Sequence, residues 1–407
     1  MATEKKLFTN EKSFLESPPA TTCTDVINMA VDAADVLAQV RERIMEPFPR
    51  KKAPMFTAFQ VSHLLGMDRT KLRVAEARIG STRGFIPKVD GADKPQNFKT
   101  YSLKETIELA QEIGNFSPRP GNKTGKVIAI ASYKGGVSKT TTAVTIAMGL
   151  SLKGYKTLLV DLDGQGSATS LMGVSPEVEV DYDDTLMPFI HGEQPDLSYA
   201  VQKTYWHHLD LIPASSSLLS AEFVIPSRSK DEYAYGYHYW KQLEIGLSKL
   251  KQEYDVIVLD TSPSLGYLTQ NSLVAADMIF SPCPQGALDF ASLTQFWGVF
   301  AEMATNLPEF ISEKSYDCVE IFITRAQSDN NELAASITGW IKGGFGAHLS
   351  NISIPESSIP QKAASEMKTV YEITGKDYSS SAYKRYREPI DKFVDHVVEE
   401  LILAWRR

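Results

Sequence analysis

Short apolar runs alternate with longer amphipathic stretches over the last two thirds of the chain. Each run is six or seven residues long and lacks the strict polar alternation of a half-exposed strand, which indicates strands buried on both faces of a parallel sheet. The stretches between the runs have helical spacing. We therefore predict an α/β fold, a mostly parallel twisted sheet with flanking helices, over residues 126–407. The predicted strands are residues 127–132, 157–163, 209–215, 255–260, 278–284 and 318–324.

The first 48 residues are predicted to hold a polar tail and one amphipathic helix. Residues 1–22 are mostly polar, whereas residues 24–45 carry apolar side chains at near-helical spacing, with Thr24 or Asp25 able to cap the start. The proline-containing residues 46–54 separate this helix from the next predicted helix. The helix either packs on its own chain or pairs with the same helix of a second copy.

Residues 56–80 are predicted to form two short helices separated by a tight turn. Gly66 interrupts the apolar spacing of the first helix, and Asp68 can cap the second. Cations are interspersed along the second helix, which is the DNA-contacting helix of a helix-turn-helix. Residues 81–99 are rich in turn formers and predict a β-wing, so we assign residues 49–116 as an α-helical winged helix-turn-helix DNA-binding domain. Its predicted DNA contacts are Arg69, Lys71, Arg73 and Arg78; a small helical module without a DNA role is the alternative.

Charge is distributed unevenly along the chain. The net charge of −8 at pH 7, taken alone, disfavours a nucleic-acid partner. Residues 50–126, however, hold 15 Lys and Arg against 7 Asp and Glu, and the rest of the chain holds 27 against 43. A basic module is therefore joined to an acidic one, and the Pro- and Gly-containing residues 117–125 are predicted to be the linker between them.

Several other classes of protein are disfavoured by the sequence. Cys23, Cys283 and Cys318 are far apart and form no C-x-x-C pair, so neither a disulfide framework nor a cysteine metal site is indicated. No run approaches the roughly 18 apolar residues of a membrane span, and the N-terminus lacks the apolar stretch of a signal peptide. We therefore expect a protein of the reducing cytoplasm.

The loop after the first strand of the predicted sheet carries candidate chemistry. Residues 132–143 match the phosphate-binding pattern G-x-x-x-x-G-K-[ST] at Lys139 and Thr140, but Tyr133 and Ser138 stand at the two glycine positions. The residues after this loop are predicted to form a helix, so backbone N–H groups of the loop and of the helix start can hold phosphate oxygens. In this context Lys139 would reach the β- and γ-phosphates, and the Thr140 hydroxyl would bind Mg²⁺.

Three carboxylates stand at the ends of predicted strands. Asp161 and Asp163 end the second run, and Asp260 ends the run at residues 255–260. Ligands of open α/β sheets collect at the carboxyl ends of the strands. Together with a phosphate loop, these side chains predict a site that binds Mg²⁺ and activates water.

These motifs together resemble one known family. The stretches "KGGVSKTT", "VDLDGQGSAT", "DVIVLDTSP" and "IPESSIPQKAASEMKTVYE" are similar to those of the deviant Walker ATPases of the ParA/MinD group. With the predicted helix-turn-helix, the chain resembles the large ParA proteins that segregate plasmids or secondary chromosomes. The resemblance runs from residue 56 to the C-terminus, and its most specific feature is a lysine second in the phosphate loop.

The resemblance implies a role for each matching residue. Lys134 is the signature lysine, which reaches across a nucleotide-sandwich dimer to the partner's phosphates, while Lys139 is the general P-loop lysine and Asp163 orients the attacking water. Because phosphoryl transfer needs positioning and charge neutralisation, a lysine delivered in trans can couple hydrolysis to dimerisation. The implied metal ligands are Thr140, Asp161 and Asp260, the last two through water. The implied nucleotide contacts are Gly135, Gly136, Val137, Ser138, Lys139, Thr140 and Thr141, with Thr324, Arg325 and Pro355 near the adenine.

Two positions depart from the common form of the family. Glycine is usual where Ser138 stands, and proline is usual where Gly164 stands. Serine fits at the first position if the local backbone is not strictly left-handed. The effect of both changes on nucleotide exchange and hydrolysis is left open, and Arg325 can equally be a surface ion-pair partner.

The C-terminal helix and the cysteines separate this chain from two other branches of the group. MinD-like relatives end in a basic amphipathic helix that lies on membranes, but residues 391–407 hold three basic and four acidic side chains, which favours a packing helix. The nitrogenase iron protein shares the phosphate loop but needs a cysteine pair, and none of the three cysteines offers one.

Non-specific DNA binding in the family uses cations late in the ATPase domain. The stretch "YKRYR" at 383–387 interleaves aromatic residues with cations, which suits a phosphate backbone. A solvated charged face is the alternative. The candidate residues are Lys362, Lys368, Lys384, Arg385 and Arg387.

The sequence thus predicts an ATP-dependent DNA segregation ATPase that uses ATP or ADP and Mg²⁺. It is expected to dimerise around ATP, to bind DNA non-specifically, and to be stimulated by DNA and a ParB-like centromere-binding partner. Its helix-turn-helix would repress its own operator, and the protein would lie in the cytoplasm with the nucleoid. The alternatives are a nucleotide-responsive repressor with incidental turnover and a MinD-like membrane-positioning ATPase.

Overall fold

The computed structural model describes most of the chain in two compact units, residues Met1–Glu46 and Pro47–Arg407. Much of the predicted wing falls outside the described residues, so its path between residues 86 and 98 is not part of the description. The described residues are 21–45, 51–79, 84–85, 99–112, 116–228, 237–327, 331–373 and 380–407.

The first unit contains helix α1 (Cys23–Met45), which confirms the predicted amphipathic helix. Thr22 caps it rather than Thr24: the Asp25 N–H donates to Thr22 Oγ1 at 3.2 Å, and the Thr22 N–H donates to Asp25 Oδ2 at 2.8 Å. Its large apolar side chains are exposed, from 44% at Leu37 to 64% at Met29. Within its own unit, the helix therefore leaves a broad apolar face uncovered.

The second unit begins with a small module of helices and strands. Two helices are joined by four residues, as predicted, and a three-stranded antiparallel sheet of order β1-β3-β2 lies beside them. These elements lie where the helix-turn-helix was predicted, and both the helix-turn-helix and its DNA-binding role stay predictions. The elements are β1 (Met55–Thr57), α2 (Ala58–Leu64), α3 (Arg69–Ile79), β2 (Gly84–Phe85), β3 (Lys99–Ser102) and α4 (Leu103–Glu112).

Local hydrogen bonds fix where the two helices of this module begin. The Gln60 N–H donates to Thr57 Oγ1 at 3.3 Å and the Thr57 N–H donates to Gln60 Oε1 at 2.8 Å, which is a capping box at the start of α2. Asp68 Oδ1 accepts from the N–H groups of Thr70 and Lys71 at 2.7 and 2.9 Å. Asp68 therefore caps α3, as the sequence predicted.

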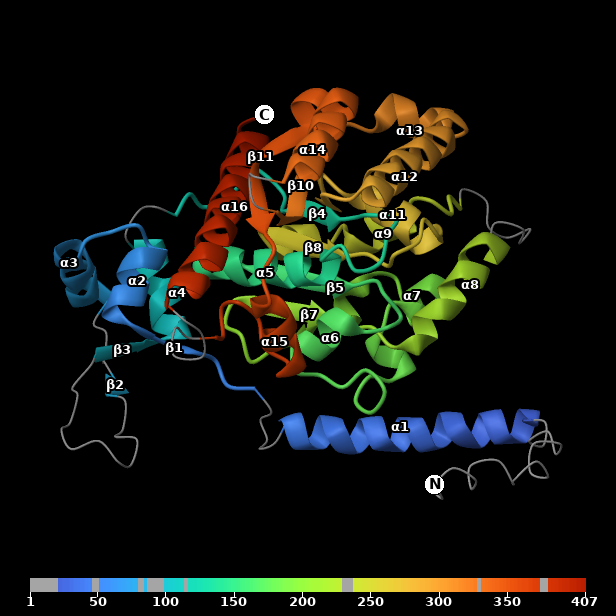
Figure 1. The fold of residues 1–407 in the computed structure, drawn as a ribbon, viewed down its shortest axis with the longest axis horizontal. Helices are drawn as coiled ribbons and strands as arrows, with labels where there is room; N and C mark the ends of the chain where they lie inside the picture. Colours follow the sequence, from blue (N-terminus) through green and yellow to red (C-terminus); the bar gives the residue numbers. More distant parts are fainter. Residues whose placement is uncertain are drawn as a thin grey trace, which may run out of the picture. The chain divides into compact units, whose positions relative to one another are not determined.

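The rest of the unit is built on an eight-stranded sheet of order β11-β10-β9-β4-β8-β5-β7-β6 (Figure 1). Every pair in it is parallel except β6 with β7, and all six predicted strands are present. The two edge strands, β6 and β11, were not predicted. The strands are β4 (Lys126–Ile130), β5 (Thr157–Asp161), β6 (Gln202–Lys203), β7 (Leu209–Ile212), β8 (Val256–Asp260), β9 (Met278–Pro284), β10 (Cys318–Ala326) and β11 (Leu349–Pro355).

Helices cover both faces of the sheet. Alternate residues of β4 point to opposite faces: Ile128 and Ile130 pack with the cluster of α5 and α16, while Val127 and Ala129 pack with the helices of the other side. The longer helices are α5 (Lys139–Leu152), α8 (Ala221–Arg228), α11 (Tyr267–Ala275), α12 (Ala287–Thr305), α14 (Glu332–Phe345) and α16 (Ser380–Arg406). The shorter ones are α6 (Ser167–Leu171), α7 (Met187–His191), α9 (Gln242–Leu247), α10 (Leu250–Glu253), α13 (Pro308–Glu313) and α15 (Ile359–Ser365), with 3₁₀ turns at η1 (Tyr182–Asp184), η2 (Leu197–Ala200), η3 (Ser216–Ser220) and η4 (Gly346–His348).

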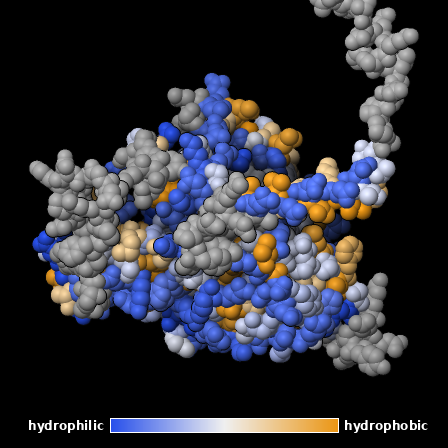
Figure 2. All heavy atoms as spheres, turned by 90° about the horizontal axis from the view of Figure 1, so that it is seen from below, coloured by the Kyte–Doolittle hydropathy of each residue, from blue (hydrophilic) through white to orange (hydrophobic). Residues whose placement is uncertain are grey.

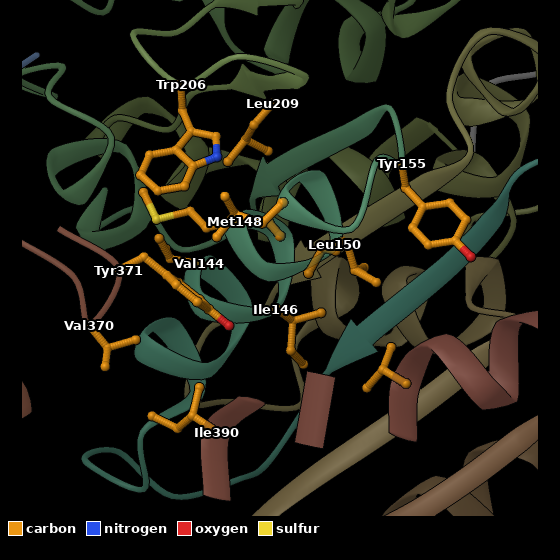
Figure 3. Packing of buried hydrophobic residues seen from close by; sticks show 14 of the residues in the cluster. Val144, Ile146, Met148, Leu150, Tyr155, Trp206, Leu209, Val370, Tyr371 and Ile390 are labelled. Atoms are coloured by element: carbon orange, nitrogen blue, oxygen red, sulfur yellow. The ribbon is translucent and has the colours of Figure 1, made fainter. Parts of the chain in front are cut away.

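Helix α5 lies in the interior, as Figure 3 shows from close by. Its side chains are apolar around most of its circumference, which is the pattern of a helix covered on all sides. Polar groups on it are hydrogen bonded: the Trp206 indole donates to Ser151 Oγ at 2.6 Å, and the Thr369 hydroxyl donates to Met148 Sδ at 3.1 Å. The helix after the phosphate loop is thus held rigidly.

The segment predicted as a linker is packed against the sheet. The Arg119 guanidinium pairs with Asp255 at 3.1 Å and donates to the Lys251 carbonyl at 3.0 Å. The Gly125 N–H donates to the same carbonyl at 2.6 Å. Residues 117–125 therefore do not separate two bodies, and residues 47–407 form one unit. The proline and glycine content reflected a turn-rich path rather than a free linker.

Helix α16 packs on the sheet, as predicted. Phe393, Val397 and Leu401 are buried against it, and no helix within the described part of the chain is long and apolar enough to span a membrane. The face of the molecule drawn in Figure 2 is mostly hydrophilic, with apolar residues in separate small patches.

Candidate active site

The phosphate loop joins the end of β4 to the start of α5. Gly136 has φ +73°, and Ser138 has φ 80° and ψ 26°, so both are left-handed. We expected serine to fit here without strain only if the backbone was not left-handed, and the backbone is left-handed. A side chain in this conformation costs about 1 to 2 kcal/mol, and the Ser138 side chain makes no capping hydrogen bond that would offset it.

Lys139, the first residue of α5, is enclosed by this loop. The residue is only 6% exposed, and its ammonium donates to the Lys134 carbonyl at 2.9 Å. Burial lowers the pKa of Lys139, while the charges of Asp260 and Asp163 oppose that shift. Lys139 thus lies inside the loop and faces the carboxylates, as its predicted role requires.

Asp161 and Asp260 are paired across β5 and β8 and are fully buried. Asp161 Oδ2 accepts from the backbone N–H and hydroxyl of Thr169 at 2.9 and 2.8 Å, and its Oδ1 accepts from the Asp163 N–H at 3.1 Å. Burial nevertheless raises the pKa of Asp161 to about 6. Sequence reasoning missed Thr169, which fixes this carboxylate.

Asp260 differs because neither carboxylate oxygen has a hydrogen-bond partner of normal geometry. Burial, and then the charge of Asp161, raise its pKa well above the usual value, although the Thr140 hydroxyl and Lys139 ammonium oppose the shift. A buried carboxylate with free lone pairs beside a hydroxyl is a suitable environment for a hard cation.

These residues fit Mg²⁺ bound together with a nucleotide. Mg²⁺ is usually held by one or two carboxylates plus waters and phosphate oxygens. Within the described residues, no group of three or more His, Cys, Asp and Glu could hold a metal ion unaided. Thr140 and Asp260 would hold the ion, and Asp161, whose oxygens already accept three hydrogen bonds, would act through bound water.

Asp163 lies at the same edge of the sheet and is partly exposed. Its Oδ1 accepts from the Gln165 N–H at 3.0 Å, and its charge raises the pKa of both Lys139 and Asp260. A solvent-accessible carboxylate beside a phosphate loop can orient a water molecule for attack.

Lys134 is ion-paired with a carboxylate other than Asp161, Asp163 and Asp260. Its ammonium lies 2.7 Å from Oδ1 of Asp289, and the two side chains are 40% and 15% exposed. Asp289 stands in the first turn of α12, where a negative charge is favourable. Sequence reasoning missed Asp289, although it follows the carboxyl end of β9 and the strand-end rule applied to that strand would have marked it.

The predicted adenine contacts lie on adjoining strands. Ala326 of β10 pairs with Pro355 of β11, so Arg325 and Pro355 are at neighbouring strand ends. Arg325 is exposed and has φ 51°, an uncommon conformation for a residue with a side chain. The Thr324 hydroxyl donates to the Val137 carbonyl at 3.1 Å, which connects this edge to the phosphate loop.

Comparison with known proteins finds relatives that match the part of the chain holding this site. The sequence profile described as "AAA domain" matches residues 125–312, which span the phosphate loop, the three carboxylates and Asp289. The chain is 27% identical over 353 residues to Protein SopA of Escherichia coli (strain K12), across 86% of this chain and 89% of SopA. It is 35% identical over 167 residues to the chromosome partitioning protein ParA of Myxococcus xanthus, across 40% of this chain and 55% of that protein.

A solved structure described as a partition protein superposes on 93% of this chain and 97% of its own, with a TM-score of 0.62 at 17% identity. Taken together, the sequence matches make the chain similar to the ParA-type partition ATPases. Like them, it is an ATPase that uses ATP or ADP with Mg²⁺. DNA binding, a ParB-like partner and dimerisation are general properties of this family.

The predicted DNA-contacting cations lie on α3, α15 and α16, with Lys368 in the segment after α15. On α3 the four cations are exposed, and Arg78 makes an ion pair with Glu112 at 3.6 Å. Lys368, after α15, is half-buried and pairs with Glu366 at 2.9 Å. The exposed cations are Arg69, Lys71, Arg73 and Arg78 on α3, Lys362 on α15, and Lys384 and Arg385 on α16.

The prediction that Arg387 contacts DNA is wrong. It is 9% exposed, its Nε donates to both carboxylate oxygens of Asp391 at 2.8 and 2.9 Å, and it lies 4.1 Å from the centre of the Tyr371 ring. Its neighbour Tyr386 is buried as well, so it cannot stack on a nucleic acid. The aromatic residue and the cation that suggested DNA binding serve instead to pack α16.

Proposed function

We propose that this ParA-type ATPase segregates DNA by forming an ATP-bound dimer, binding DNA non-specifically, and leaving the DNA when a ParB-like centromere-binding partner stimulates hydrolysis. The observation that supports this is the different placement of the two loop lysines. Lys139 is buried beside the carboxylates, whereas the Lys134 side chain is 40% exposed. A half-exposed lysine on a phosphate loop is available to a second chain, and its delivery in trans would couple hydrolysis to dimerisation.

The proposed non-specific DNA surface consists of Lys362, Lys368, Lys384 and Arg385. Three of these cations are exposed, and each phosphate that they neutralise would release a counterion. Arg387 is excluded from this surface by its burial. A position in the cytoplasm on the nucleoid follows from such binding.

The proposed operator-binding surface is α3, with Arg69, Lys71, Arg73 and Arg78. The helix is capped, exposed along its charged side, and preceded by a short turn, which is the arrangement that enters a major groove. Through it the protein would repress its own operator.

Helix α1 is proposed to pair with α1 of a second copy. Seven large apolar side chains on it are at least 44% exposed, and a helix with such a face is marginal in water unless the face is covered. Deletion of residues 1–46 would then weaken self-association in the absence of ATP. Unchanged association would show that α1 packs elsewhere.

The function is tested by ATP hydrolysis with and without non-specific DNA and the partner, for wild type and Lys134→Ala. Wild type should be stimulated strongly and Lys134→Ala should not. A matched control is Lys249→Ala. Lys249 is also exposed and ion-paired, with Asp196 at 3.5 Å, but it precedes α10, which leads into the amino end of β8, whereas the nucleotide site lies at the carboxyl ends of the strands. Stimulation retained by Lys134→Ala would refute the trans-acting lysine.

The two alternative functions give different results. For a repressor with incidental turnover, Asp163→Ala would leave both operator protection and replicon inheritance normal. For a membrane-positioning ATPase, the protein would co-sediment with liposomes, and deletion of residues 391–407 would abolish this. The proposed function predicts lost inheritance for Asp163→Ala and no co-sedimentation.

A further inference from the structure

A buried ion pair lies outside the nucleotide site. The Lys51 ammonium is 3.0 Å from Glu372 Oε2, and the two side chains are 9% and 7% exposed. Lys51 also lies 4.8 Å from the centre of the Tyr205 ring. Removing an amine from water is costly unless it is paired and hydrogen bonded, so the position of Lys51 is held by specific contacts.

The Lys51 ammonium also contacts α6, the helix that follows the loop of Asp163. It donates to the carbonyl of Leu171, the last residue of α6, at 2.6 Å. Helix α6 begins four residues after Asp163, and its Thr169 makes two hydrogen bonds to Asp161. One short helix is therefore fixed to a nucleotide-site carboxylate by its middle and to Lys51 by its end.

The aliphatic part of Lys51 packs on the chain just beyond α6. Gly173 has φ +88°, and a Cβ there would lie 3.0 Å from Lys51 Cδ and 3.1 Å from its Cγ. The backbone after α6 thus approaches the lysine stem as closely as it can. Contacts at the ammonium and along the stem together restrict the movement of α6.

Glu372 extends this junction to a third part of the chain. Its Oε2 accepts from the Thr369 N–H at 2.8 Å, and its Oε1 accepts from the Tyr205 hydroxyl at 2.8 Å. Thr369 directly follows Lys368, one of the proposed DNA contacts. The residues just before β1, helix α6, and the segment after α15 therefore meet at one ion pair.

We propose that Lys51 is a positioning residue for ATP hydrolysis: by holding the end of α6 it keeps Thr169, Asp161 and the Asp163 loop in their hydrolytic arrangement. Its coupling to DNA rests on the proposed function, because it would transmit a displacement of the N-terminal module or of the Lys368 segment to α6. Its effect on hydrolysis without DNA rests only on the ATPase activity of the family.

Lys153 provides a matched control. Its ammonium pairs with Asp395 of α16 at 2.5 Å and donates to the Leu64 carbonyl after α2 at 3.3 Å. Like Lys51, its ammonium links the module of residues 51–112 to the ATPase sheet, but its hydrogen bond and ion pair within the described residues involve neither α6 nor the nucleotide-site carboxylates. A residue that only holds the two parts together would behave as Lys153 does.

The test compares Lys51→Met and Lys153→Met in the full chain, by kcat and KM for ATP without DNA and by the melting temperature. Residues that orient a metal-site ligand typically change activity by about 10- to 100-fold. We expect Lys51→Met to lower kcat about 10-fold with KM within about twofold of wild type, and Lys153→Met to leave both within about twofold. Equal effects on kcat in the two variants, or a wild-type kcat in Lys51→Met, would overturn the proposal.

A second variant covers the case in which Lys51→Met does not fold. Glu372→Gln removes the charge but leaves the Lys51 bond to Leu171, so kcat should fall by a smaller factor, about threefold, at unchanged KM. A lowered melting temperature with wild-type kcat would contradict the positioning role. Wild type that hydrolyses ATP but is not stimulated by DNA would contradict the proposed function alone, because the basal comparison does not use DNA.

Discussion

The Lys134 ammonium and the Asp289 carboxylate of the same chain lie 2.7 Å apart. The lysine that is proposed to serve a second chain is therefore occupied within its own. An ion pair this exposed is worth about 1 kcal/mol or less, so a nucleotide phosphate of another chain can compete for the lysine. Asp289 would act as a weak restraint that holds Lys134 within its own chain until the phosphates of a second chain compete for it.

Asp289→Asn is expected to promote ATP-dependent dimerisation, because it removes the charge that holds Lys134. The ATP concentration for half-maximal dimer should fall by about two- to fivefold, the equivalent of 1 kcal/mol or less. Sedimentation velocity across an ATP titration measures it. Asp317→Asn is the control, because Asp317 pairs with Lys126 at 2.7 Å at the start of β4, away from the phosphates. A weaker dimer for Asp289→Asn would mean that Asp289 guides Lys134 rather than restrains it.

Ser138→Gly is expected to stabilise the protein, because glycine adopts the left-handed conformation without the strain of a side chain. The gain should be about 0.5 to 1 kcal/mol after the greater flexibility of unfolded glycine is counted, or roughly 1 °C in melting temperature for a unit of this size. Differential scanning calorimetry checks it. Ser138→Ala keeps the Cβ and should melt with wild type; equal melting of all three would show that the loop carries no strain.

Arg387→Ala is expected to destabilise the fold by about 3 to 5 kcal/mol, because it leaves the buried Asp391 charge uncompensated. Urea unfolding measures this loss. The double variant Lys384→Ala/Arg385→Ala should keep wild-type stability and instead reduce the slope of log affinity for duplex DNA against log salt by about 1.8. An Arg387→Ala protein as stable as wild type with weakened DNA binding would show that Arg387 contacts DNA.

His396 and Glu320 should make stability depend on pH. His396 Nε2 lies 2.6 Å from Glu320 Oε2, and this hydrogen bond, with the charges of Glu320, Glu400 and Glu399, raises the pKa of His396 despite its burial. Because the folded pKa exceeds the unfolded value of about 6.5, the stabilisation is complete below that pH and is lost as pH rises through the folded pKa. His396→Gln should therefore lose more unfolding free energy at pH 6 than at pH 9. An equal loss at both would show that His396 is neutral throughout.

Much of the fold follows from local patterns in the sequence. The six predicted strands are apolar runs buried on both faces, and such runs need no partner to be recognised. The two missed strands lack this signal: β6 has only two residues, and β11 alternates between half-buried and exposed positions. Edge strands carry weaker patterns because one side of them faces solvent.

The candidate site was predictable where chemistry is local and not where it depends on distant pairs. Lys139, Asp161 and Asp260 were marked by loop and strand-end positions. Lys134 and Asp289 are separated by 155 positions, and Lys51 and Glu372 by 321, so no spacing rule connects them.

Arg387 was misjudged for a different reason. The helical spacing of the buried Ile390, Phe393 and Val397 extends back to Tyr386, so it placed that residue on the packed side of α16 and Arg387 beside it. The prediction of DNA contact relied instead on the cations of residues 383–387 and did not use this helical spacing.

The anchored residues 117–125 also limit how the protein can be divided. The Ser117 carbonyl accepts from the Tyr155 hydroxyl at 3.1 Å, and the Thr124 carbonyl accepts from the Trp405 indole at 3.2 Å. Phe116 packs edge-on against Tyr155 with ring centres 5.0 Å apart. A fragment that began at residue 126 would expose the side chains of Tyr155 and Trp405 to water. The ATPase part is therefore not an exchangeable cassette, and a chimera between relatives must carry residues 116–125 together with the sheet and helix α16.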